Sequence, residues 1–186
     1  ANNGLNDMSD FDLELMVDGQ SVETMNIPGT IEPFNEANYQ FSVPQDFSAI
    51  GEYNVSAIVS DEDDEYGNND TLNVVLNKIH VLDGELTIGD IAVACDEVVE
   101  IDAIVENHGE NTITNVVIGV SVNGSALENF NAGTNIPYEE QGVVSITIDD
   151  NLQEINNDIT LSLVSVNGQG DGDITNDFAS TTTTLD

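Results

Sequence analysis

Basic residues are almost absent from this chain. Of its 186 residues only one, Lys78, is Lys or Arg, whereas 36 are Asp or Glu, and the formal net charge is −35. Because nucleic-acid binding needs Lys and Arg side chains that neutralise phosphates, this balance excludes nucleic acids as partners. An anionic membrane surface is repelled for the same reason.

Other absences narrow the fold and the function. The sequence has no Trp, 5% aromatic residues and a single cysteine, Cys95, which can form no internal disulfide and is expected to be a small buried side chain. No apolar run approaches the roughly 18 residues of a membrane span, so we expect no direct membrane insertion. His80 and His108 lack a nearby Gly-x-Ser-x-Gly motif, and no glycine-rich loop opens a helix. We therefore predict no catalytic or cofactor-binding residues and no enzyme activity.

The acidic excess also carries information about location. A compact chain of this charge repels itself, and salt screening or divalent cations would relieve the repulsion. We infer a secreted or cell-surface protein in a salty external medium that contains calcium.

Alternating apolar residues are the main structural signal. Between Val98 and Gly124, apolar and polar residues alternate as in half-buried strands, and the second run stops at Asn123-Gly124, a hairpin dipeptide. No segment has helical periodicity. Seven strands are predicted in the second half: Leu86–Ala94, Val98–Glu106, Val116–Val122, Ala126–Phe130, Val143–Ile148, Ile159–Val166 and Phe178–Thr184. This pattern predicts an all-β, immunoglobulin-like antiparallel sandwich.

The two halves of the sequence repeat each other with an offset near 105. Matching segments are Asn2-Asn3-Gly4 with Asn107-His108-Gly109, Phe11–Val17 with Val116–Val122, Tyr39–Val43 with Val144–Ile148, Tyr53–Ala57 with Ile159–Leu163, and Asn69-Asp70 with Asn176-Asp177. We predict two tandem sandwiches, over residues 1–80 and 81–186. The first lacks its two N-terminal strands here, because the chain is cut from a longer repeat array or because a neighbouring subunit donates a strand.

Several segments resemble a known family. The stretch from Cys95 through ENHG, the VNG hairpin and NGQGDGDITND is similar to CARDB-type immunoglobulin-like repeat modules of bacterial surface proteins. The segments SDFDLELMVDGQ, PGTIEP, YQFSVPQDFS and DEYGNNDTL resemble the same modules in adhesins and enzymes secreted by the type IX route. The resemblance implies a seven-stranded sandwich, repeated in tandem, that acts as a spacer or adhesive stalk.

Two loops concentrate oxygen ligands of the kind that calcium prefers. The candidate ligands are Asp61, Asp63, Asp64, Glu65, Asn68 and Asp70 in the first half, and Asp171, Asp173 and Asp177 in the second. The alternative is a solvated turn in which Asn and Asp side chains bond their own backbone. Neither loop has the spacing of an EF-hand.

Candidate glycosylation sites lie in or beside turns. Asn69 and Asn123 begin Asn-x-Ser/Thr triplets, and Asp70-Thr71-Leu72 makes Thr71 a candidate O-glycan acceptor.

These observations predict a non-enzymatic extracellular repeat module of a bacterial adhesin, stalk or filament. Its partners would be neighbouring repeats of the same or identical chains, and surface glycans or other cells. Two alternatives stay open: an accessory module of a secreted hydrolase, and a filament subunit assembled by strand donation.

Overall fold

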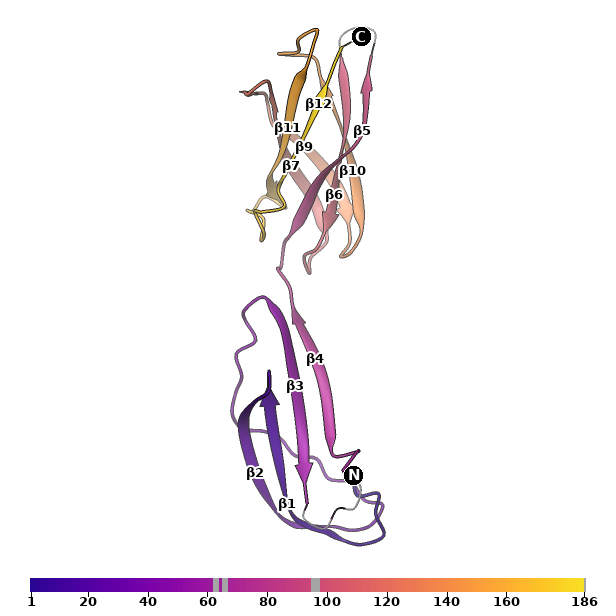
Figure 1. Cartoon of the computed structure of the whole chain (residues 1–186), viewed down its shortest axis with the longest axis vertical. Coiled ribbons are helices and arrows are strands. Elements are labelled where there is room, and N and C mark those ends of the chain that lie inside the picture. Colours follow the sequence, from indigo (N-terminus) through magenta and orange to yellow (C-terminus); the bar gives the residue numbers. More distant parts are fainter. Residues whose placement is uncertain (62–63, 65–66, 95–97, 186) are drawn as a thin grey trace. The chain divides into compact units, whose positions relative to one another are not determined.

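The structure is a computed structural model that describes residues 1–61, 64, 67–94 and 98–185, so Cys95 lies outside the described residues. The chain divides into two compact units, Ala1–Lys78 and Ile79–Asp186, each of which is described by itself (Figure 1). The sequence placed the boundary after residue 80. Within the described residues every regular element is a β-strand, and no helix is long and apolar enough to cross a membrane.

The second unit is a sandwich of two antiparallel sheets. One sheet has the order β10–β6–β5, and the other has β12–β11–β7–β8, with β9 also paired to β7 (Figure 1). The strands are β5 Gly84–Val93, β6 Val99–Asn107, β7 Ile113–Val122, β8 Ser125–Ala126, β9 Phe130–Ile136, β10 Gln141–Ile148, β11 Asn157–Val166 and β12 Phe178–Thr183. The predicted all-β, immunoglobulin-like antiparallel fold is confirmed.

The predicted strand Ala126–Phe130 is wrong. The structure instead has the short β8, in which Ala126 faces Ser121, and the separate β9, in which Phe130 faces Ile118. These two pairings with β7 are out of register by one residue, so residues 127–129 leave the strand to take up the difference. The described part of this unit therefore has eight strands where seven were expected.

The core of the second unit lies between its sheets. Alternate residues of the central strands are at most 5% exposed: Val99, Ile101, Ala103 and Val105 of β6, Val116, Ile118, Val120 and Val122 of β7, and Ile159, Leu161 and Leu163 of β11. Burying one such aliphatic side chain contributes about 1.5–3 kcal/mol relative to leaving it exposed. The period-2 alternation is therefore what holds this sandwich together.

The first unit is one antiparallel sheet with the order β2–β1–β3–β4. Its strands are β1 Met8–Val17, β2 Gln20–Ile31, β3 Gly51–Ser60 and β4 Thr71–Lys78. This order corresponds to β9–β7–β11–β12 of the second unit, and no further strand occurs among the described residues of Ala1–Lys78. The described residues of the first unit thus form only one of the two sheets, in agreement with the prediction that its two opening strands are missing.

The alternation over Tyr39–Val43 does not form the expected strand. Residues 32–50 contain no strand, although the matching residues of the second unit form β10. Because β10 pairs with β6, and Ala1–Lys78 has no described counterpart of β6, this segment has no ladder to join. It is held instead by the Glu23 carboxylate, which accepts hydrogen bonds from the backbone N–H groups of Ser42 and Val43, both at 2.8 Å.

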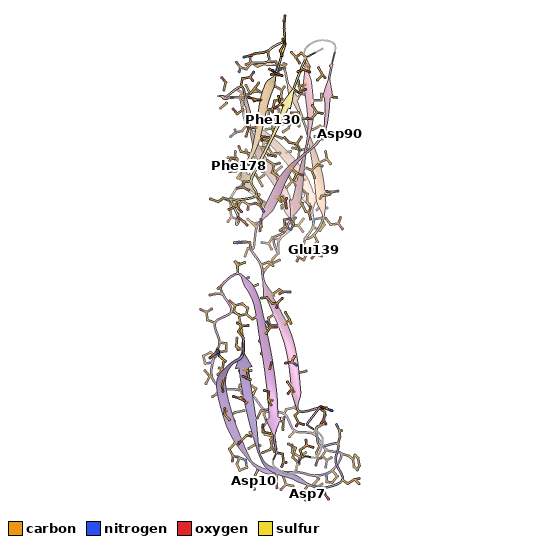
Figure 2. The ribbon with its side chains drawn as sticks, in the orientation of Figure 1. Asp7, Asp10, Asp90, Phe130, Glu139 and Phe178 are labelled. Carbon is orange, nitrogen blue, oxygen red and sulfur yellow. The ribbon has the colours of Figure 1, made fainter. Side chains whose placement is uncertain are left out.

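A buried asparagine ties together one end of the second unit. The side-chain amide of Asn107 donates hydrogen bonds to the carbonyls of Asn111 and Ile136, both at 2.9 Å, and its oxygen accepts from Gly109 N–H at 2.9 Å. The backbone of Asn107 pairs with Glu139 and Glu140. Glu139, labelled in Figure 2, adopts a positive φ of 62° in the turn before β10.

The first unit contains the same hydrogen bonds 105 positions earlier. Asn2 donates to Asn6 O and Ile31 O, both at 2.8 Å, and accepts from Gly4 N–H at 2.9 Å. Its backbone pairs with Phe34, which has a φ of 64°, and with Asn35. The two units are therefore built on one hydrogen-bonded frame.

The structure corrects one part of the sequence alignment between the units. Leu13 faces Val59, and its counterpart Ile118 faces Leu163, so Val59 matches Leu163. The offset for this strand is 104, whereas the sequence alignment set Tyr53 against Ile159, an offset of 106. Both offsets keep the apolar residues on one face, because side chains alternate with a period of two.

Candidate acidic sites

The loop before β4 gathers the acidic residues predicted in the first unit. Asp61 and Asp70 are half-buried, Asp64 and Asn68 are exposed, and Asp63 and Glu65 lie outside the described residues. Burial raises the pKa of Asp70, and a hydrogen bond between its carboxyl group and Asp64 raises it further. Asp61 adds a smaller repulsion of the same sign. This loop thus brings together carboxylates that a proton or a cation would stabilise.

A groove beside this loop is lined by further acids. Its walls come from β1, β2 and β3 as well as from the loop, and they include Asp10, Asp12, Asn26, Asp61 and Asp70. Asp10 lies at the bulge in β1 with a φ of 56° (Figure 2). Asp12 accepts a hydrogen bond of 2.9 Å from Asn26, so its carboxylate is already partly satisfied.

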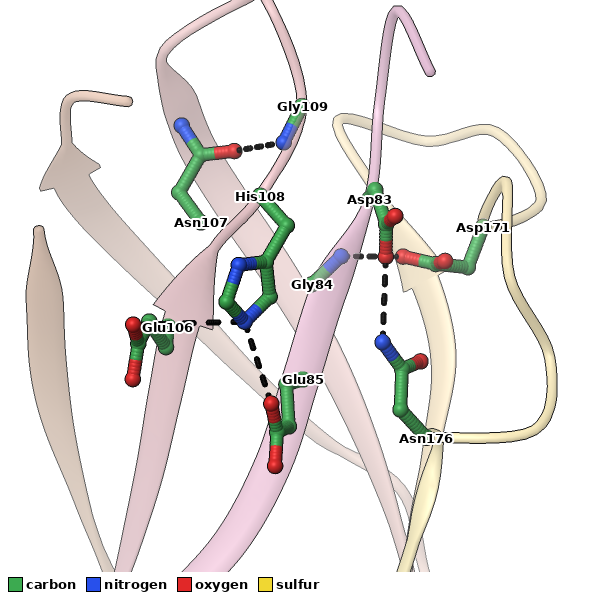
Figure 3. Close-up of polar contacts among 9 residues, drawn as sticks. All are labelled: Asp83, Gly84, Glu85, Glu106, Asn107, His108, Gly109, Asp171 and Asn176. Carbon is green, nitrogen blue, oxygen red and sulfur yellow. Dashed lines mark hydrogen bonds and ion pairs between the residues drawn. The ribbon is translucent and has the colours of Figure 1, made fainter. Parts of the chain in front are cut away.

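The loop between β11 and β12 holds the acids predicted in the second unit. One Asp171 oxygen accepts from Gly84 N–H at 2.7 Å (Figure 3). The other accepts from Asp173 N–H at 2.9 Å. Burial raises the pKa of Asp171, although these two N–H donors oppose the increase. Asp171 therefore links this loop to the start of β5, and both of its carboxylate oxygens accept hydrogen bonds from backbone N–H groups.

Asp173 and Asp177 differ strongly in their surroundings. Asp173 accepts hydrogen bonds from the hydroxyl and the N–H of Thr175, at 2.6 and 3.0 Å, and the hydroxyl bond is the main reason why its pKa is lowered. Asp177 is only 5% exposed. Burial, followed by the negative charges of Asp171 and Asp83, raises the pKa of Asp177 to about 6.

Asp83 and Asn176 belong to this cluster but were not among the candidate ligands of the sequence analysis. Asp83, 7% exposed, accepts a 3.2 Å hydrogen bond from the side-chain amide of Asn176 (Figure 3). Its backbone carbonyl accepts from His108 and Gly109 N–H. The sequence analysis placed Asp83 only near the start of the second predicted sandwich, residues 81–186. The only available signal was the Asp83-Gly84 pair before a strand, which does not indicate what lies opposite.

Two oxygens at this place have no hydrogen-bond partner. They are Oδ1 of Asp177 and Oδ1 of Asn176, and both are buried. Within the described part of the chain, however, no three His, Cys, Asp or Glu side chains are arranged to hold a metal ion. A cation here would thus use amide and carbonyl oxygens with fewer than three carboxylates, which is within the ligand range of calcium.

His108 lies beside two half-buried carboxylates. Its Nε2 lies 3.0 Å from Glu85 Oε2 and 3.9 Å from Glu106 Oε1, and Glu85 and Glu106 face each other across β5 and β6 (Figure 3). Like charges directly opposite each other destabilise a sheet, and the hydrogen bond between His108 and Glu85 partly satisfies one of these two carboxylates. The geometry gives His108 a structural role.

The candidate glycosylation residues have unequal access. Thr71 begins β4 and is exposed, as is Asn69 two residues before it. The Asn123 amide donates 3.1 Å hydrogen bonds to Asn151 O and Asn157 Oδ1, which a glycan on that nitrogen would disturb.

The comparisons with known proteins give structural likenesses only. No family model matches the chain, and no curated protein matches it. The crystal structure of the CARDB domain of a Pyrococcus furiosus protein, in complex with di-metal ions, is 16% identical, with a TM-score of 0.46, and the match covers 59% of this chain and 97% of that one. A solution NMR structure of the same domain is 18% identical, with a TM-score of 0.44 and coverages of 57% and 96%. The description of the second unit as an immunoglobulin-like sandwich rests on its strand pairing.

Proposed function

We propose that this chain is a two-unit part of a tandem sandwich array outside the cell, where it serves as a non-enzymatic spacer or adhesive stalk. The observation that carries the proposal is the shared frame: Asn2 and Asn107 make the same hydrogen bonds in both units. A chain that repeats one module with so little variation in its internal bonding gains length and spacing from each added copy.

The short connection between the units also supports a spacer. His80 O and Val81 O accept from Glu110 and Asn111 N–H, and Leu82 O accepts from Gly172 N–H, so these residues are bonded into the second unit. A connection of this kind leaves few free residues between modules. The partners we propose are neighbouring repeats, surface glycans or other cells, with neither nucleic acid nor membrane insertion.

The test uses cells that carry the protein. An antibody against the second unit should label intact cells as strongly as lysed cells, and labelling that requires lysis would contradict an external location. Residues 79–186 are then exchanged for an unrelated sandwich of equal length. Retained attachment supports a spacer, and lost attachment supports direct adhesive contact. Deletion of residues 79–186 should reduce attachment, because it shortens the stalk. If neither the exchange nor the deletion changes attachment, the stalk proposal is wrong.

We also propose that calcium binds the acidic loops, first of all near Asp177. The supporting observation is the pair of buried, unpartnered oxygens on Asp177 and Asn176. Calcium should raise the melting temperature of the second unit relative to chelator at matched ionic strength. Asp177→Asn should reduce this increase, whereas Asp90→Asn, an exposed change on β5, should leave it intact. Equal melting temperatures with calcium and with chelator would rule the site out.

A further inference from the structure

The first unit exposes a sheet face that its counterpart in the second unit covers. In the second unit the apolar face of β7 and β11 is packed beneath β5, β6 and β10, and Ile118, Val120 and Leu161 are at most 3% exposed. The matching face of the first unit has Leu13, Leu15 and Val17 of β1 with Val55, Ala57 and Val59 of β3. All six of these side chains are only half-buried.

The edge strand β4 extends this face. Leu72 faces Ala57, Val74 faces Val55 and Leu76 faces Tyr53, so all three side chains lie on the same side of the sheet as that face. They are 66%, 44% and 40% exposed, respectively. A continuous apolar face of this kind, with large side chains on an outer strand, is typical of a surface that another element covers.

The second unit indicates which element fits. Asn107 is the last residue of β6, and Asn2 makes the same side-chain hydrogen bonds as Asn107 and the same backbone pairs with the following turn. In the second unit the β6–β10 ladder continues directly from this point, beginning with Glu106 and Gln141. The equivalent residues of the first unit, 36–43, lie just beyond the Asn2 pairs but have no strand to join.

We propose that the open face of the first unit is covered by a β-hairpin of the β5–β6 type, supplied by the polypeptide that leads directly into Asn2. Its two strands have apolar residues at alternate positions, as in Val99, Ile101, Ala103 and Val105. The second strand pairs with residues 36–43, which thereby become the counterpart of β10. The proposal deepens the tandem-array function and rests on it, since the hairpin is the missing part of one repeated module.

The source follows from the position of Asn2. A strand donated by a separate chain would have to end beside Asn2 and leave a chain break inside the frame. A strand continuous with Asn2 runs into the existing hydrogen bonds without a break, as β6 runs into Asn107. Loop-closure entropy also favours the covalent source over a separate peptide.

The test grafts a copy of residues 84–106 onto the whole chain in place of Ala1, so that the copy leads into Asn2. Amide hydrogen exchange of residues 36–43 should slow by about tenfold or more, because these amides enter a sheet ladder. Binding of an apolar dye to the first unit should fall in parallel. The control graft has Asp at the copies of Ile101 and Val105, and it should give neither change.

The outcomes separate the alternatives. Amides of the second unit report whether the grafted chain has folded; if it has not, a graft of residues 99–106 alone is measured by the same criteria. Unchanged exchange of residues 36–43 in a folded graft overturns the proposal, as does equal protection by the Asp control. A separate peptide with the sequence of residues 84–106 is added to the ungrafted chain as a further arm. If this peptide protects residues 36–43 and the graft does not, the covalent source is wrong and strand donation is supported. None of these results depends on where the protein is located, so failure here is distinct from failure of the intact-cell test.

Discussion

Replacing Asn107 with Ala should destabilise the second unit while the first unit keeps its stability. The substitution removes a fully buried amide that makes three hydrogen bonds. Gly109 N–H keeps a second acceptor, the Asp83 carbonyl at 3.2 Å, but Ile136 O is buried and Asn111 O partly so. Each buried group left without a partner costs about 1–3 kcal/mol, so we expect a loss of about 3 kcal/mol in unfolding free energy.

A loss of that size is large for a domain whose total stability is on the order of 5–15 kcal/mol. The assay is native-state hydrogen exchange on the whole chain, in which β6 amides report the second unit and β3 amides report the first. Asn135→Ala, an exposed change on β9, is the matched control and should stay within about 0.5 kcal/mol of the parent chain.

The reciprocal substitution tests the repeat itself. Asn2→Ala should lower the protection of β3 amides and leave those of β6 unchanged, because Asn2 holds the same position in the other unit. The shared frame would be refuted if Asn107→Ala costs no more than Asn135→Ala, or if Asn2→Ala has no effect on the first unit.

Three further predictions concern the acidic end of the second unit and the overall charge. Because burial raises the pKa of Asp177 to about 6, above the ordinary value of 3.8 for an aspartate, the folded state binds this proton more tightly than the unfolded state. The free energy of unfolding should thus rise by up to about 3 kcal/mol as the pH falls through 6 towards 4. Asp177→Asn should remove this part of the pH profile, whereas the control Asp90→Asn should keep it. Gly172→Ala should cost about 1–3 kcal/mol in urea unfolding, since its Cβ would lie 2.5 Å from Leu82 O, whereas Gly170→Ala has open space and should be neutral. With a net charge of −35, the melting temperature should increase from low to molar salt, and a flat response would show that self-repulsion is unimportant.

Some sequence predictions failed where two chain segments had to meet. The alternation at Tyr39, Phe41 and Val43 is as regular as that of β10, but a strand forms only beside a partner. The alignment of β3 with β11 was wrong by two residues because a slip of two preserves the inward face. Periodicity therefore identifies a face but does not select the neighbour or the register.

The acidic loops show the same limit. The sequence located Asp171 and Asp177 as a cluster, yet their roles differ because Asp171 accepts two backbone N–H groups and Asp177 keeps an unpartnered oxygen. Asp83 lies beside this loop only in the folded structure, where it contacts Asn176 of the loop and the residues that follow β6. The sequence of the loop alone predicts neither the different roles of Asp171 and Asp177 nor the position of Asp83.

The sequence by itself determined the all-β class, the hairpin at Asn123-Gly124 and the repetition near 105 residues, because alternation and turn chemistry are local properties. Only the tertiary structure decided which strands pair, which carboxylates lie together and which sheet face of the first unit is open. Those features depend on contacts between residues far apart in the chain, so they follow from packing and hydrogen bonding across the fold.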